Sequence, residues 1–191
     1  GAHWGLSTLD VATHVPGARV VAIEPAPDNL ERLLANLRWN RMEGRVEVVP
    51  TAVADRPGSA VMAAGISMTL RVIDATAPTA RPTSKVQTAS LDSLCAQMRF
   101  GTDTLVFVKA DVEGQELAML RGAEALLASG RLGGLVWEYH PEYHGDGPGS
   151  PTAEIVHRLS EAGLACFTFP HHHFGGALVP FTPGPGVCNV V

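Results

Sequence analysis

The chain has 191 residues, 46% of them hydrophobic and 17% charged, which suits one ordinary globular domain and makes two a crowded fit. Its formal net charge of −5 gives no general attraction to polyanions, so we expect no nucleic-acid partner. Three scattered cysteines, Cys95, Cys166 and Cys188, fit neither a disulfide framework nor a zinc site and favour the cytoplasm. Because no run approaches the roughly 18 apolar residues of a membrane span, we expect no membrane association either.

The chain opens on the turn composition Gly1 to Gly5, which normally follows a strand. We therefore expect residues 1–191 to form a single domain that is N-terminally truncated and lacks its first strand. A helix is predicted from Leu6 to Val15, ended by a Pro-Gly pair, and a short apolar strand follows from Arg19 to Ile23.

The clearest helical pattern in the first half has leucines at i, i+3, i+4 and i+7 from Leu30, with Asp28 placed to cap it. A strand is predicted at Val46 to Val49 and a probable edge strand at Ala60 to Met62. Residues 63–85 show little periodicity and are interpreted as a loop, which either covers a site or is an uninvolved insertion.

In the second half, Ser90 is placed to cap a helix that reaches Met98, and Leu105 to Val108 reads as a buried strand. The remaining predicted elements are a helix over 117–127, a strand at 135–137, a helix over 155–162 and final strands at 166–169 and 186–191. This alternation predicts an α/β fold, a doubly wound and mostly parallel sheet with helices on both faces.

In a doubly wound sheet the ligand lies beyond the carboxyl ends of the strands. Glu24 follows the first predicted strand, about 20 residues after the glycine turn, where an acidic side chain can accept both hydroxyls of a ribose. His3 and Leu6 stand where G-x-G-x-x-G would have glycines, so the spacing counts against a dinucleotide. Taken singly, the glycines suit an ordinary turn and Glu24 suits a helix cap or a solvated position.

A second charged segment follows the strand that ends at Val108, with ionisable residues at Lys109, Asp111 and Glu113. Burial at such a position should perturb their pKa values. For Glu116 we favour a structural role at the start of a helix, where a carboxylate complements the helix dipole.

Several motifs together resemble the FkbM methyltransferases, which are class I, Rossmann-like enzymes. They occur in the family's order across about residues 1–140: the glycine turn, Ile23-Glu24-Pro25, Asn36 with Asn40, Ser90-Leu91-Asp92, Val108 to Gly114, and Trp137 to His140. The resemblance implies an S-adenosylmethionine (SAM) dependent O-methyltransferase that acts on a hydroxyl of a small molecule such as a sugar, a polyketide or another secondary metabolite.

The resemblance also implies roles for individual residues. The SAM site would contain Gly1, Ala2, His3, Gly5, Glu24, Ala54 and Asp111, although the family usually has asparagine at the position of His3. The acceptor would contact Glu113, Glu138 and His140. The catalytic candidates are His140, Asp111 and Lys109.

An alcohol must lose its proton during methylation, so a general base is needed. We favour His140 over Asp111, because a histidine titrates near neutral pH, and a purely structural role for His140 stays open. The alternatives for the whole chain are a non-catalytic nucleoside-binding module and a metal-dependent enzyme that uses Asp111, Glu138 and His140. Metal binding by His144 or by His171 to His173 is disfavoured, since consecutive side chains in an extended chain point to opposite sides, and a substrate-facing loop is the favoured role for these histidines.

Overall fold

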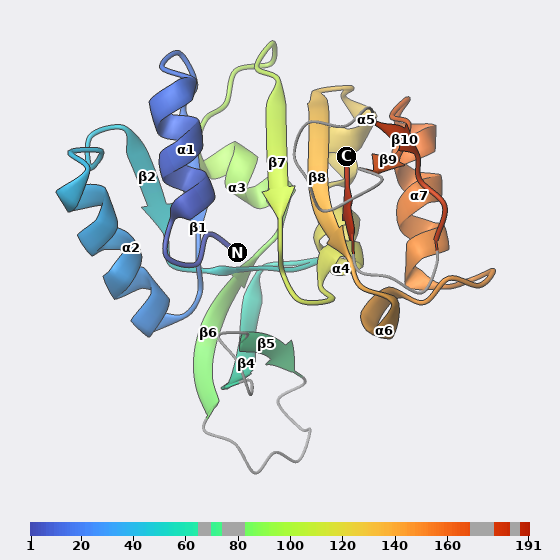
Figure 1. Ribbon diagram of the computed structural model, residues 1–191, viewed down its shortest axis with the longest axis horizontal. Helices are drawn as coiled ribbons and strands as arrows, with labels where there is room; N and C mark the ends of the chain where they lie inside the picture. Colours follow the sequence, from blue (N-terminus) through green and yellow to red (C-terminus); the bar gives the residue numbers. More distant parts are fainter. Residues whose placement is uncertain (65–69, 74–82, 169–177, 184–187) are drawn as a thin grey trace. The chain divides into compact units, whose positions relative to one another are not determined.

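The computed structural model describes residues 1–64, 70–73, 83–168, 178–183 and 188–191, which form two compact units (Figure 1). Unit 1 contains residues 1–53 and 57–89, and unit 2 contains residues 54–56 and 90–191. Among the described residues, none of the helices combines the length and the apolar character that a membrane crossing requires.

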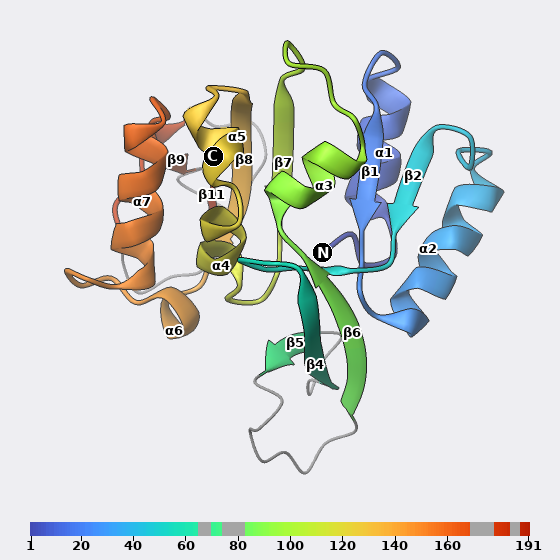
Figure 2. The same cartoon turned by 180° about the vertical axis from the view of Figure 1, so that it is seen from behind.

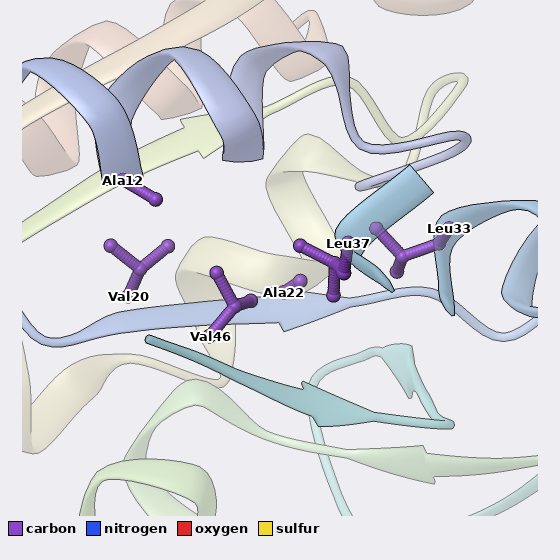
Figure 3. Packing of buried hydrophobic residues seen from close by; sticks show 6 residues of the cluster. All are labelled: Ala12, Val20, Ala22, Leu33, Leu37 and Val46. Carbon is purple, nitrogen blue, oxygen red and sulfur yellow. The ribbon is translucent and has the colours of Figure 1, made fainter. Parts of the chain in front are cut away.

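Unit 1 begins with two helices packed on a pair of parallel strands. They are α1 (Leu6–His14), β1 (Val20–Ile23), α2 (Pro27–Trp39) and β2 (Val46–Val49), with Val20 opposite Val46. Their shared core, shown in Figure 3, consists of Ala12, Val20, Ala22, Leu33, Leu37 and Val46. All four elements are where the sequence predicts them.

One detail of α2 differs from the prediction. The N-cap residue is Ala26, and no side chain makes a capping hydrogen bond. Asp28 lies inside the first turn, so its predicted capping role is wrong. Pro27 takes the first helical position because its fixed φ and missing N–H suit that place.

The rest of unit 1 is a four-stranded sheet in the order β3-β6-β4-β5, with bounds β3 (Ala52–Val53), β4 (Gly58–Ala64), β5 (Leu70–Ile73) and β6 (Thr83–Ala89). The predicted edge strand at 60–62 is therefore wrong as an edge, because β4 lies between β6 and β5. The predicted loop at 63–85 is also wrong in part, since it contains β5 and the start of β6. The residues of β5 and β6 show no clear alternation of apolar and polar side chains. Strand formation depends strongly on the neighbouring strands, so the sequence did not reveal these two.

Unit 2 contains a five-stranded sheet in the order β10-β9-β11-β8-β7 and five helices. The helices α4 and α5 lie on one face of β8, as Figures 1 and 2 show from opposite sides. The elements are α3 (Leu91–Gln97), β7 (Val106–Ala110), α4 (Glu116–Arg121), α5 (Glu124–Ala128), β8 (Leu132–Tyr139), α6 (Pro141–His144), α7 (Pro151–Glu161), β9 (Phe167–Thr168), β10 (Val179–Pro180) and β11 (Cys188–Val190).

Helix caps account for two features of unit 2. The predicted cap at Ser90 is confirmed, because its hydroxyl accepts the Ser93 N–H at 3.1 Å. The single helix predicted over 117–127 is two helices, and the carboxylate of Asp92 caps the second by accepting the N–H groups of Ala125 and Leu126 at 2.8 and 2.9 Å. In return the Asp92 N–H donates to the carbonyl of Gly122 between the two helices.

The sheets are mixed. Of the described strand pairs, β1–β2, β3–β6 and β7–β8 are parallel and the other five are antiparallel, so "mostly parallel" does not hold for them. The predicted burial of the strand at 105–108 is wrong too, since Leu105 is 60% and Phe107 is 72% exposed. The Phe107 ring lies over Gly133 and Gly134, which have no side chains to enclose it. The doubly wound arrangement stays a prediction.

Candidate active site

In unit 1 the glycine turn is tied to the end of β1 by Glu24, which is only 4% exposed. Glu24 Oε2 accepts the backbone N–H of His3 at 2.8 Å. Glu24 Oε1 accepts the backbone N–H of Ala26 at 3.0 Å and the side-chain amide of Asn29 at 3.2 Å. The carboxylate therefore organises the turn through three neutral donors.

These bonds limit what else Glu24 can bind. A carboxylate oxygen has two acceptor positions. Both positions on Oε1 are filled, whereas Oε2 accepts one hydrogen bond from the described residues and has one position left among them. The geometry thus leaves one acceptor position for a ligand hydroxyl, where the sequence suggested that the carboxylate would accept two.

Glycine is required at two places in this turn. At Gly1 an added Cβ would lie 2.6 Å from Glu24 Oε2. At Gly5 the φ of +89° is in the left-handed region, and an added Cβ would lie 2.5 Å from Cδ1 of the buried Leu33. A bare backbone therefore passes next to the carboxylate, which allows a ligand to approach both.

Two asparagines of α2 hold the turn from the other side. Asn36 Nδ2 donates to the carbonyl of Trp4 at 2.8 Å, and the Trp4 indole N–H donates to Asn29 Oδ1 at 3.2 Å. Asn29 thus joins Trp4 to Glu24. Asn29 was not predicted from the sequence. Its place in the first turn of the helix that follows Glu24 could have indicated a contact with that carboxylate.

In unit 2 the structure brings together charged residues from the ends of β7 and β8 and from the segments just after them. Lys109 Nζ lies 3.1 Å from Asp111 Oδ2. Burial raises the pKa of Glu113, and the negative charges of Asp111 and Glu138 raise it further. Burial also raises the pKa of Glu138, with Asp111 adding to it and His140 and Lys109 opposing. The predicted perturbation is confirmed for Glu113.

His140 is the N-cap residue of α6 and lies among these carboxylates. Its ring stacks on Tyr143, with ring centroids 4.4 Å apart and planes 18° apart. Its Nδ1 atom is buried and has no hydrogen-bond partner among the described residues. A buried ring nitrogen without a partner is unusual, and a bound water, an ion or a catalytic role would account for it.

Glu116 is the first residue of α4, as predicted, but it does more than start a helix. It is 2% exposed, and its Oε2 lies 2.7 Å from Nε2 of His144, which is 1% exposed. From the sequence, His144 was expected in a substrate-facing loop, with metal binding disfavoured. The spacing of His140 and His144, four residues apart, was the available signal that the two rings belong to one turn.

A family model described as the methyltransferase FkbM domain matches residues 1–164. The chain belongs to the FkbM methyltransferase family. A crystal structure of the methyltransferase FkbM from Methylobacillus flagellatus KT is similar in fold, with a TM-score of 0.58 and 19% sequence identity. The alignment covers 100% of this chain and 41% of that one. No curated protein gives a significant match.

The remaining predicted residues of this FkbM domain have varied surroundings. The Ala2 N–H donates to the Ile23 carbonyl at 2.9 Å, which joins the turn to β1. The carbonyl of Ala54 lies close against Gly122 within unit 2, a packing contact that leaves its predicted cofactor role a prediction. His171 to His173 lie outside the described residues. Within the described ranges, no three His, Cys, Asp or Glu side chains form a group that could hold a metal ion.

The residues of unit 1 fit the nucleoside part of SAM. Glu24 offers an acceptor position on Oε2, and the bare backbone of the glycine turn leaves room beside it. His3, at a φ of +52°, has a buried Nε2 atom without a partner in the described part of the chain. An acceptor position on a carboxylate and an unpaired ring nitrogen in the same turn suit a ligand that carries polar groups.

Proposed function

We propose that this FkbM domain is a SAM-dependent O-methyltransferase that transfers a methyl group to a hydroxyl of a small molecule, such as a sugar, a polyketide or another secondary metabolite. The observation that carries the proposal is Glu24, a buried carboxylate that is bonded to the glycine turn and keeps one acceptor position. Family membership supplies the reaction class.

SAM, when bound, supplies an electrophilic methyl group on its sulfonium. In unit 1 the proposed roles are to accept a ribose hydroxyl at Glu24 Oε2 and to present the backbone of Gly1 to Gly5, including Ala2 and His3, to the nucleoside. Asn29 and Asn36 keep that backbone in place.

In unit 2 the proposed general base is His140. It takes the proton of the acceptor hydroxyl as the carbon–oxygen bond forms, which in other enzymes contributes roughly 10²- to 10⁴-fold. Glu113 and Glu138 are proposed to accept hydrogen bonds from the acceptor. The proposed role of Lys109 is to orient Asp111 through their 3.1 Å contact.

The test begins with calorimetric titration of SAM and S-adenosylhomocysteine into the protein and into Glu24→Ala. We expect binding by the protein and a loss of at least about 10-fold in affinity for the variant, because hydrogen bonds to charged groups are worth about 1.5 to 3 kcal/mol. Glu47→Ala is the matched control, since Glu47 lies in β2 of the same pair of strands but makes an exposed ion pair with Arg19.

The second stage follows S-adenosylhomocysteine release with a panel of hydroxylated acceptors, for the protein and for His140→Asn. Binding of SAM without turnover of any acceptor would favour a nucleoside-binding module. A folded protein that binds neither nucleoside would overturn the proposed function.

A further inference from the structure

The proposed reaction leaves one buried ionisable pair in unit 2 without a role. Glu116 and His144 meet at 2.7 Å, and their side chains are 3% and 1% exposed. The His144 ring stands edge-on to Trp137, with centroids 5.2 Å apart. Burying such a pair is costly unless every polar atom is bonded, so its remaining bonds are informative.

The bonds of His144 fix where its proton lies. Its Nδ1 atom is 3.0 Å from the backbone N–H of His140 and 3.1 Å from the His140 carbonyl. That carbonyl already accepts the backbone N–H groups of Tyr143 and His144, both at 3.0 Å. Nδ1 is therefore an acceptor for the His140 N–H, and the ring proton lies on Nε2 and is donated to Glu116.

The other oxygen of Glu116 extends this arrangement to the segment after β7. Glu116 Oε1 accepts the backbone N–H of Val112 at 3.2 Å. A continuous hydrogen-bonded chain thus runs from the Val112 N–H through Glu116 and His144 to the His140 N–H. It joins the two segments, after β7 and after β8, that carry the proposed catalytic and substrate-binding residues of unit 2.

A packing contact joins the same two segments a second time. Gly114 has a φ of +88°, and a Cβ added there would lie 3.0 Å from Cβ of Tyr143. Tyr143 in turn stacks on the His140 ring. The ring of His140 is thus held by its backbone on one side and by Tyr143 on the other.

We propose that Glu116 and His144 are positioning residues that hold the imidazole of His140 in place. The proposal rests on the proposed function in giving His140 the role of base. What it adds is that a buried carboxylate–imidazole pair, neither member of which needs to touch a substrate, sets the orientation of that base. Double-sided fixing of this kind is what a catalytic group requires.

The variant that isolates this role is Glu116→Gln. The glutamine has the same size, and its carbonyl oxygen can still accept the Val112 N–H. Its amide then faces His144 with a donor, which favours the ring form with the proton on Nδ1. That form places a donor against the His140 N–H, so one bond of the chain is lost without creating a cavity.

Two readouts follow the histidines directly. Two-bond ¹H–¹⁵N correlation spectra of ¹⁵N-histidine protein report the ring form of each of the eight histidines. Peptide mass spectrometry after brief treatment with diethyl pyrocarbonate reports the acylation rate of His140, with the exposed His14 as internal reference. We expect His144 to carry its proton on Nε2 in the unaltered protein.

In Glu116→Gln we expect the proton of His144 to move to Nδ1, the ring signals of His140 to shift, and the acylation rate of His140 to rise several-fold as its buried Nδ1 atom is released. His144→Gln should change His140 in the same direction, because it removes the acceptor for the His140 N–H. It also serves as the test if Glu116→Gln does not fold. The matched control is Glu161→Gln, which alters an exposed Glu–His pair with a contact of 3.6 Å.

The proposal is overturned if His140 has the same signals and the same acylation rate in Glu116→Gln or His144→Gln as in Glu161→Gln. Titration of S-adenosylhomocysteine into the same proteins separates this result from the proposed function. A protein that binds no nucleoside but shows the expected changes at His140 keeps the positioning pair and loses the methyltransferase assignment. A protein that binds S-adenosylhomocysteine normally but shows no change at His140 in the variants keeps the proposed function and loses the positioning pair.

Discussion

Each unit of the molecule contains a buried glutamate near the end of a strand, and the two are used differently. Glu24 in unit 1 is 4% exposed and is bonded to three neutral N–H donors. Glu116 in unit 2 is 2% exposed and is bonded to one backbone N–H and one imidazole.

The difference shows that burial alone does not identify a ligand-binding carboxylate. Glu24 lies beside a glycine turn that has no side chain at Gly1, and its proposed role is to accept a ligand hydroxyl there. Among the described residues Glu116 has acceptor positions left as well, but it is 2% exposed and its bonds go to the His144 ring and the backbone of Val112. Access to the carboxylate, and not its bond count, separates the two roles.

The largest expected effect is on the enclosed carboxylate. Glu116→Ala should lower the free energy of unfolding by about 3 to 5 kcal/mol, because removing one member of a buried pair leaves the other without compensation. Urea denaturation followed by circular dichroism measures this. A cost below about 1 kcal/mol would mean that Glu116 is no more enclosed than a surface carboxylate.

Glu24→Gln should cost less, about 1 to 3 kcal/mol, because the carboxamide keeps one acceptor oxygen and turns one N–H contact into a donor–donor contact. The same urea titration gives the value. An equal loss of stability in Glu24→Gln and Glu116→Ala would contradict the difference between the two glutamates, since Glu24 would then be a structural carboxylate like Glu116.

Gly114→Ala is expected to cost about 1 to 2 kcal/mol for the left-handed backbone, with a further shift of Tyr143. The near-ultraviolet circular dichroism of the aromatic side chains should change. Gly130→Ala is the control, because its φ is +66° and nothing lies within 4 Å of an added Cβ there. Equal spectra for the two variants would mean that the contact between Gly114 and Tyr143 does not hold the Tyr143 ring in place.

Glu138→Gln should have the smallest effect, and in the opposite direction. Because the pKa of Glu138 is raised by burial and by Asp111, the folded protein binds that proton more tightly than the unfolded chain does. Ionisation therefore costs stability as the pH rises through the interval above the unfolded pKa. The variant should raise Tm at pH 7, with an increase of about 1 kcal/mol or less in the free energy of unfolding. Near about pH 3 its Tm should equal that of the unaltered protein. A fall in Tm at pH 7 would contradict the raised pKa.

The sequence was sufficient to predict the elements whose side chains face one apolar core. The helices α1 and α2 and the strands β1 and β2 have local apolar patterns, and all four were placed correctly. The strands β5 and β6 were missed, because their pairing with β4 depends on partners distant in sequence. The exposed face of β7 was missed because an apolar run does not reveal that its neighbour offers only Gly133 and Gly134.

For the candidate site, the sequence identified residues by the chemistry of their side chains and could not identify their partners. Glu24 and His140 were named because they follow strands. Asn29 and His144 were not given their roles, because an amide that bridges Trp4 to Glu24 and a ring that bridges Glu116 to His140 become visible only when distances are known. The number of acceptor positions left on Glu24 likewise depends on bonds across 21 residues of chain.

The reciprocal bonding of Asp92 has a consequence for how unit 2 opens. Its carboxylate accepts two N–H groups in the first turn of α5, and its own N–H donates to the Gly122 carbonyl just ahead of α5, so the first turns of α3 and α5 are bonded to each other in both directions. Hydrogen exchange at the amides of Asp92, Ala125 and Leu126 should then follow a single opening event with one protection factor. In folding, the short helices α3 and α5 would behave as one cooperative element with two segments.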